Sequence, residues 1–272
     1  MTPPAHAPSS ASPLTLAWIL RIGVAGCFIG HGAFGIITKA AWVPYFAVGG
    51  ISEPLAWKLM PVVGAMDIAI GILALVWPTR ALYAWAAFWA IWTALCRPLA
   101  GEPFWETLER AGNYGVPIAL LVAFGFHSPW FKRLPASWPA FSDLTRTRFA
   151  WSLRLTTATL LAGHAGLGFF TQKAGLAQHY SAAWADAPTN TVAIVGAFEF
   201  ALALAVLLRP FPAFLVAIAF WKMASESLFL VAGAPIWEFI ERAGSYTAPL
   251  ALAVLLARSR RDNLSSFSPA AA

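Results

Sequence analysis

A stretch of fifteen residues occurs twice in this chain, and it constrains the fold more than any other feature. The first copy spans 103–117, and the second spans 235–249, which is 132 positions further along. Nine of the fifteen residues are identical, and chance does not produce such a match in a chain this rich in Ala, Leu and Val. The sequence therefore predicts two related halves.

Each copy of this motif is predicted to begin a helix. Pro103 and Pro235 suit the first helical position, where the missing N–H leaves no hydrogen bond unmade. Acidic and basic residues then follow at spacings of three and four, so they share one helix face. These residues are Glu106, Glu109 and Arg110 in the first copy and Glu238, Glu241 and Arg242 in the second, with Tyr114 and Tyr246 one turn later.

The composition excludes a water-soluble globule. Hydrophobic residues make up 59% of the 272 residues, and charged residues make up only 11%. Long runs with so few charges predict helices that span a lipid bilayer. In such a protein the net charge of +6 reports orientation in the bilayer, and it is not a sign of nucleic-acid binding.

Eight apolar runs are predicted to span the bilayer, four in each half, which makes the expected fold an all-α polytopic membrane protein. Each run can cross a hydrocarbon core of about 30 Å at a rise of about 1.5 Å per residue. The runs cover 14–38, 56–77, 81–99 and 105–126, and then 149–171, 191–208, 211–231 and 236–257. Because each half has an even number of spans, the two four-helix repeats are expected to be parallel.

The predicted domain organisation follows from these runs. A disordered N-terminal tail covers 1–13, and the first four-helix repeat covers 14–126. A cytoplasmic linker covers 127–148, the second four-helix repeat covers 149–257, and a cytoplasmic tail covers 258–272. Basic residues gather in the linker, the tail and the turns on the same side. The positive-inside rule therefore predicts a multi-pass protein of the cell inner (plasma) membrane with both termini in the cytoplasm.

Ionisable residues inside predicted spans are the first candidates for a functional site, because a charged group costs several kcal/mol in lipid. His31 and Asp67 lie in the first two spans of the first half, and His164 and Glu199 lie at the matching places in the second. We assign these four residues to catalysis, since buried imidazole and carboxylate groups can exchange protons near neutral pH. Hydrogen bonding within a helix bundle is the structural alternative.

The repeated motif adds candidates for substrate binding. Its carboxylate, guanidinium and tyrosine side chains, named above, are expected to join the histidine and the acid of their own half. The result would be one polar pocket per half, in the outer half of the membrane. An acid and a base one turn apart at a helix start can also be purely structural, because they pair with each other and with the helix dipole.

The two halves differ in one respect. Lys222 and Glu226 in the seventh run replace Ala90 and Ala94 of the third, whereas Arg97 has no charged counterpart in the second half. We include Lys222, Glu226 and Arg97 among the candidates for substrate binding. The two sites are chemically unequal, so we expect one active pocket and one degenerate or specialised pocket.

The order of polar residues is the same in both halves: an early Arg, a Gly-His pair, a Lys after the first span, and a Gly-x-x-acid in the second. These are Arg21, Gly30, His31, Lys39, Gly64 and Asp67, and then Arg154, Gly163, His164, Lys173, Gly196 and Glu199. This order resembles the DoxX-like family of four-span membrane proteins, which includes the small membrane subunit of thiosulfate:quinone oxidoreductase. The chain thus resembles a tandem fusion of two such units, although Asp67 stands where the family has Glu.

Three functions remain open at this point. The resemblance implies a quinone-linked oxidoreductase component, with quinone as cofactor and a redox enzyme as partner; haem held by His31 and His164 is a variant of it. The same acids would also suit a proton- or cation-coupled transporter or channel for small solutes. The third reading is a membrane anchor or assembly partner of a redox enzyme. No metal site is predicted, because Cys27 and Cys96 form no CxxC motif.

Overall fold

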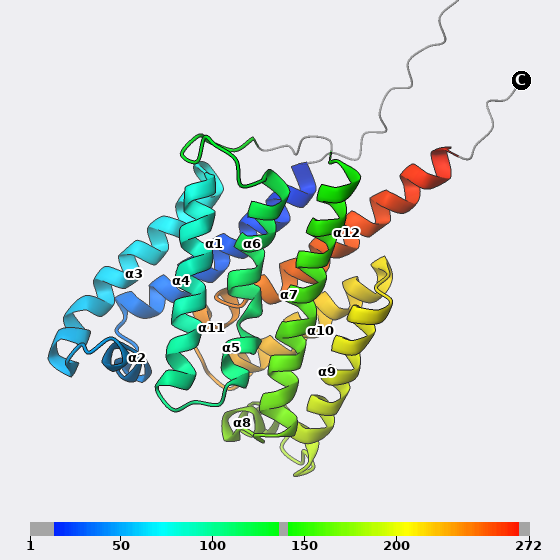
Figure 1. Cartoon of the computed structure of the whole chain (residues 1–272). Coiled ribbons are helices and arrows are strands. Elements are labelled where there is room, and N and C mark those ends of the chain that lie inside the picture. The colour runs from blue at the N-terminus through cyan, green and yellow to red at the C-terminus, as the bar shows by residue number, and fades with distance from the viewer. Residues whose placement is uncertain (1–13, 136–140, 267–272) are drawn as a thin grey trace, which may run out of the picture.

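The computed structural model describes residues 14–135 and 141–266, and within these ranges it contains helices and turns but no strand (Figure 1). The all-helical prediction is confirmed for this part of the chain. The predicted tail at 1–13, the linker residues 136–140 and the final residues 267–272 lie outside the described residues.

The first three apolar runs each form one long helix, and their bounds agree closely with the prediction. The turn after the first helix contains two short elements that the sequence did not predict. The first half consists of α1 (Leu14–Ile36), η1 (Ala40–Trp42), α2 (Val43–Val48), α3 (Glu53–Val76), α4 (Arg80–Leu99), α5 (Trp105–Glu109) and α6 (Ala111–Phe124).

The second half has the same order of long and short helices. It consists of α7 (Asp143–Phe169), α8 (Ala174–Ala183), α9 (Thr191–Leu208), α10 (Pro212–Val231), α11 (Trp237–Ile240) and α12 (Ala243–Ser266). Helix α7 begins six residues before the predicted start at 149, because the Ser142 side chain caps it by accepting a hydrogen bond from the Thr145 backbone N–H. The connection between the halves is therefore shorter than the predicted linker.

The repeated motif does not form the continuous helix start that its spacing predicts. Helix α5 ends at Glu109 and α6 begins at Ala111, with Arg110 between them at φ −83° and ψ 12°. In the second copy a turn at Glu241 and Arg242 separates α11 from α12. Each motif is thus a broken helix, and its charged residues surround the break instead of forming one stripe.

Two tyrosines stabilise the breaks. The Tyr114 hydroxyl donates a hydrogen bond to the Thr107 carbonyl at 3.1 Å, and the Tyr246 hydroxyl donates to the Phe239 carbonyl at 2.9 Å. These carbonyls belong to the short helices α5 and α11, where an interrupted helix leaves acceptors without an intrahelical partner. Tyr114 and Tyr246, which the sequence predicts to bind substrate, have this structural role.

Helices α1, α6, α7 and α12 form the centre of the molecule, since α1 and α7 each contact both α6 and α12. The other four long helices lie outside: α3 packs on α1, α4 on α6, α9 on α7 and α10 on α12 (Figure 1). Each half therefore contributes two helices to the centre and two to the outside.

Close backbone contacts bring the broken helices against the central helices. Gly30 of α1 lies against the backbone of Glu241, and Gly163 of α7 lies against the backbone of Glu109, so a Cβ on either glycine would clash. These two contacts join the halves, because each links the first helix of one half to the break of the other.

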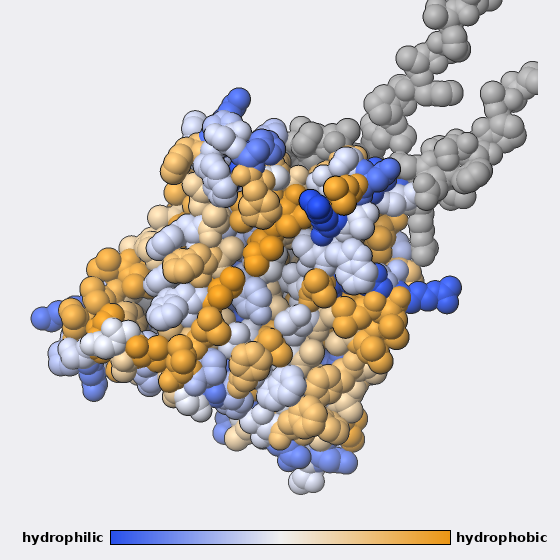
Figure 2. Space-filling model, viewed as in Figure 1, coloured by the Kyte–Doolittle hydropathy of each residue, from blue (hydrophilic) through white to orange (hydrophobic). Residues whose placement is uncertain are grey.

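Within the described residues, four helices are long and apolar enough to cross a membrane: residues 16–36 of α1, and α3, α9 and α10. Their outer faces are apolar, as the space-filling view shows for one side of the molecule (Figure 2). Only 28–33% of the most apolar segments of α3, α9 and α10 is buried inside the protein, against 61% for α1. Outward-facing apolar helices of this kind are consistent with an α-helical membrane protein in a lipid bilayer.

Candidate functional site

The charged residues of each motif contact the opposite half. Arg242 Nε lies 3.7 Å from Glu109 Oε1, and Arg110 Nη1 lies 3.8 Å from Glu241 Oε1. All four side chains are buried. These two contacts differ from the prediction that each half gathers its motif residues into a pocket of its own. They cross between the halves because the breaks pack on the central helices of the other half.

Two lysines extend this exchange at the ends of the first helices. Lys39, which follows α1, pairs with Glu238 of the second half at 2.5 Å. Lys173, which follows α7, pairs with Glu106 of the first half. Matching positions of the two halves thus make reciprocal ion pairs, and buried carboxylates acquire the opposite charge that burial requires.

Arg242 is the most highly connected cation of this network. It lies 2.8 Å from Glu238, 2.9 Å from Glu241 and 3.0 Å from Glu226. Because its planar guanidinium has five N–H donors, it can bind several carboxylates at once. The spacing predicts that Arg242 contacts Glu238 or Glu199, and the contact with Glu238 is present. The matching prediction that Arg110 contacts Glu106 or Asp67 is not met, because the ion pairs of Arg110 in the described structure are with Glu109 and Glu241.

The second half contains a closed cluster of charges. His164 Nδ1 hydrogen-bonds Glu199, and the Trp221 indole N–H donates to the same carboxylate at 2.9 Å. Lys222 Nζ lies 3.6 Å from Glu199 and 2.8 Å from Glu226. Glu199, Lys222 and Glu226 are at most 1% exposed, so the site is filled by its own side chains.

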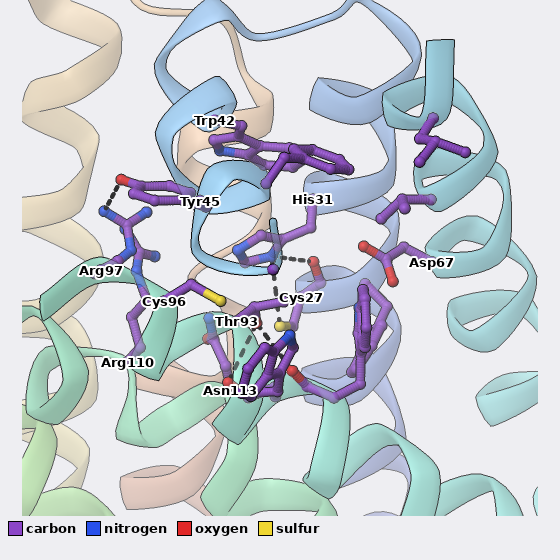
Figure 3. A pocket seen from close by; sticks show the side chains of 18 of the residues that line it. Cys27, His31, Trp42, Tyr45, Asp67, Thr93, Cys96, Arg97, Arg110 and Asn113 are labelled. Carbon is purple, nitrogen blue, oxygen red and sulfur yellow. Dashed lines mark hydrogen bonds between the residues drawn. The ribbon is translucent and has the colours of Figure 1, made fainter. Parts of the chain in front are cut away.

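The first half instead contains a cavity of about 250 Å³ between α1, α2, α3, α4 and α6. Its walls are mainly apolar and aromatic. Its polar groups come from several helices and point toward one another around the empty space (Figure 3). They are His31, Asp67, Thr93, Arg97, Arg110 and Asn113, with the thiols of Cys27 and Cys96.

Asp67 is the unusual member of this set. It is 4% exposed, and its Oδ1 has no hydrogen-bond partner among the described residues. His31 does not pair with Asp67 in the way that His164 hydrogen-bonds Glu199. Instead, His31 Nδ1 bonds the Cys27 carbonyl at 2.9 Å and Nε2 lies 3.7 Å from Glu241. The cavity therefore presents a buried acceptor that lacks a donor.

A polar lid lies at one end of the cavity. Tyr45 of α2 donates a hydrogen bond to Glu102, and Arg97 lies 3.0 Å from the Tyr45 hydroxyl and 3.2 Å from Glu102. Burial raises the pKa of Tyr45 to about 12. Burial by itself would raise the pKa of Glu102, but the Tyr45 hydrogen bond and the Arg97 charge outweigh it and hold that pKa below its ordinary value.

One wall of the cavity reaches the apolar exterior. Leu59, Val62 and Val63 of α3 face Trp89 and Trp92 of α4 along this wall. Val62 is 63% exposed and Trp92 is 40% exposed, so the same side chains line the cavity and the outer surface. The wall of the cavity formed by α3 and α4 is therefore also part of the apolar outer surface.

The structure divides the predicted site residues into two groups. His31, Asp67, Arg97 and Arg110 line the cavity. The remaining charged candidates, together with His164, belong to the ion-pair network and the closed cluster: Glu106, Glu109, Glu199, Lys222, Glu226, Glu238, Glu241 and Arg242. Within residues 14–135 and 141–266, no three His, Cys, Asp or Glu side chains are arranged to hold a metal ion.

Sequence reasoning missed several residues that line the cavity. Cys27 and Cys96 are among them, and the signal was available, since leucines occupy the matching positions of the second half. Smaller side chains on one side of a repeat indicate space there. Comparison with family models, curated proteins and solved structures finds no match for this chain.

Proposed function

We propose that the protein is a membrane transporter for a small amphiphilic solute, which enters the cavity of the first half from the bilayer. The observation that carries this proposal is the buried carboxylate of Asp67, which lines an apolar cavity and whose Oδ1 has no hydrogen-bond partner among the described residues. An apolar pocket with a few convergent polar groups is the usual form of a small-molecule site. An ionisable residue at membrane depth is by default a candidate for function.

In this proposal the chain crosses the inner membrane eight times. Helices α4, α7 and α12 contain 20, 27 and 24 residues, which is enough to cross about 30 Å of hydrocarbon. Helices α5 and α6 cross as one broken span, and α11 pairs with α12 in the same way. The beginning of α1 and the end of α12 lie at the same end of the bundle (Figure 1), which supports placing both termini in the cytoplasm.

The two halves are proposed to be parallel repeats related by a pseudo-twofold axis. The reciprocal ion pairs of Lys39 with Glu238 and of Lys173 with Glu106 support this arrangement, because such pairs come from matching positions. A tandem fusion of two DoxX-like units remains our proposal for its ancestry. It rests on the order of polar residues in each half.

Quinone-linked oxidation is the second candidate. The carbonyl oxygens of a quinone only accept hydrogen bonds, so they pair with Asp67 only when its carboxyl is protonated, whereas a ligand that donates also pairs with the ionised carboxylate. What favours a redox role is that Cys27, Cys96 and His31 line the same cavity. A quinol, which has hydroxyl donors, would fit better than a quinone. Haem bound by His31 and His164 belongs to the same candidate.

Anchoring of a redox enzyme is the remaining reading. It would assign the buried charges to helix packing alone, and the closed cluster of the second half supports it for that half. The cavity does not support the anchoring function, because helix packing does not require a cavity beside a buried carboxylate.

Two measurements test the proposed transport. The first is mass spectrometry of small molecules that co-purify with the wild-type protein and with Ala90→Met, which fills the cavity without adding charge. The second is uptake of the identified molecule into proteoliposomes that contain no electron donor. We expect a ligand that Ala90→Met loses and an uptake that Asp67→Asn reduces at least tenfold. Release of a quinone, with no uptake, would favour the redox candidate.

A further inference from the structure

In the second half, side chains of the protein itself complement the acid. Trp221 of α10 donates to Glu199, and Trp89 of α4 lies within hydrogen-bonding reach of Asp67. Both the tryptophans and the acids are 132 positions apart, so α4 and α10 present the same face to the acid of their half. The residue that follows the tryptophan along the chain is Lys222 in α10 and Ala90 in α4.

The ammonium group of Lys222 occupies the space beside the acid in the second half. It is 1% exposed and lies between Glu199 and Glu226. In the first half Ala90 lines the cavity, so the matching space is empty. At this position the first half has a methyl group where the second half has a long cationic side chain, which leaves more room beside Asp67.

The cations that line the cavity do not take over this role. Arg97 lies 3.2 Å from Glu102 and 3.4 Å from Glu106, and Arg110 pairs with Glu109 and Glu241. Neither arginine has an ion pair with Asp67 among the described residues. A buried carboxylate without an opposite charge is unfavourable by several kcal/mol, so a ligand that brings this charge would bind with a large gain.

We propose that the cavity binds a molecule with a protonated amine beside Asp67, and that Lys222 is a built-in substitute for this ligand in the second half. This inference rests on the proposed function and names its solute class. Trp89 and Trp92 also line the cavity, and indole faces attract cations. The apolar wall of α3 suits a hydrocarbon body. The ligand class is therefore an alkyl- or arylalkylammonium ion.

The first experiment measures binding of radiolabelled octylammonium and octanol to the full-length protein in lipid nanodiscs. Octanol is the matched neutral probe, so it controls for partition into lipid. Ala90→Lys rebuilds the internal cation, and Ala90→Met fills the same space without charge. We expect saturable binding of octylammonium to the wild type, at least tenfold tighter than octanol, and its loss in both variants. Only Ala90→Lys should raise the unfolding temperature of the free protein.

The second experiment removes the ammonium group from the buried cluster of the second half. Lys222→Ala leaves Glu199 and Glu226 without their ammonium group, so its unfolding temperature should fall. Added ethylammonium should restore most of that loss, whereas ethanol should not. A folded Lys222→Ala protein that ethylammonium does not stabilise would overturn the substitution argument. If this variant does not accumulate, the two Ala90 variants decide the proposal.

The outcomes separate this inference from the proposed function. Equal affinity for octanol and octylammonium, lost in Ala90→Met, would disprove the amine class while leaving an amphiphile cavity in place. Octylammonium binding that survives Ala90→Lys would place the ligand elsewhere and also overturn the inference. If neither probe binds saturably and Ala90→Met co-purifies with the same molecules as the wild type, the proposed function itself is wrong.

Discussion

Asp67 and Glu199 occupy matching positions but have different surroundings. Glu199 accepts from His164 and Trp221 and lies beside Lys222, so its charge is fully compensated. Asp67 is one methylene shorter, and its Oδ1 has no partner in the described structure. The same type of group therefore belongs to a closed charge cluster in one half and, in our proposal, binds a ligand in the other.

Amide substitution should separate these two roles. Glu199→Gln removes the charge that faces Lys222, and breaking a buried ion pair costs about 3–5 kcal/mol. Asp67→Asn removes an uncompensated charge, so the free energy of unfolding should not fall, while octylammonium binding should weaken at least tenfold. Denaturant unfolding and ligand binding of both variants check this. Equal losses of stability would contradict the assignment.

At the scale of single elements, the breaks at Arg110 and Arg242 depend on tyrosine hydroxyls that bind carbonyls of α5 and α11. Tyr114→Phe and Tyr246→Phe keep the ring and remove only the hydrogen bond. Each should lower the free energy of unfolding by about 0.5–1.5 kcal/mol. The double variant should show the sum of both losses, measured by denaturant unfolding. Unchanged stability would mean that other contacts fix the breaks.

The lid formed by α2 should respond to acid. Because the folded-state pKa of Glu102 lies below its ordinary value, its contribution to stability is present above that ordinary value, about 4.3. It is lost as the pH falls through the folded-state pKa. Amide hydrogen exchange of α2 should therefore accelerate at acidic pH in the wild type. Glu102→Gln should exchange fast at every pH, and Tyr45→Phe should weaken the lid similarly. A wild-type profile that matches Glu102→Gln would refute this.

At the scale of the whole molecule, the halves depend on each other. The ion pairs of Glu109 with Arg242 and of Arg110 with Glu241 cross between them, and all four side chains are buried. A single half would leave these charges unpaired, at several kcal/mol each. We expect residues 1–139 or 140–272 to be degraded when expressed alone and to co-purify as a complex when expressed together. Stable single halves would show that the crossing pairs contribute little.

Membrane orientation can be tested with cysteine labelling, because native Cys27 and Cys96 are buried. Ser142 is exposed just before α7, and Ser52 is exposed just before α3 at the opposite end of the bundle. A membrane-impermeant maleimide added to intact cells should label Ser52→Cys and not Ser142→Cys. The opposite pattern would reverse the proposed orientation.

Sequence periodicity and repetition were sufficient to predict the all-helical fold and most of the long helices. Apolar runs predict helices well because burial in lipid or protein selects apolar residues along the whole element. The bounds of α9, at Thr191–Leu208, agree with the predicted run, and those of α3 and α4 differ from it by at most three residues. The candidates His31 and Asp67 were also identified, because polar groups are rare in such runs.

Only the tertiary structure shows which residues of the two halves contact each other. Helical spacing places Glu109 and Arg110 on one face, but the helix is broken at Arg110, and Glu109 packs against Gly163 of α7 in the other half. Spacing along the chain cannot report such a contact, because it joins residues distant in sequence. The cavity beside Asp67 likewise required the positions of five helices. The sequence by itself determined which side chains are costly to bury, and the three-dimensional packing determined that Lys222 lies beside Glu199 while Asp67 has no ion pair among the described residues.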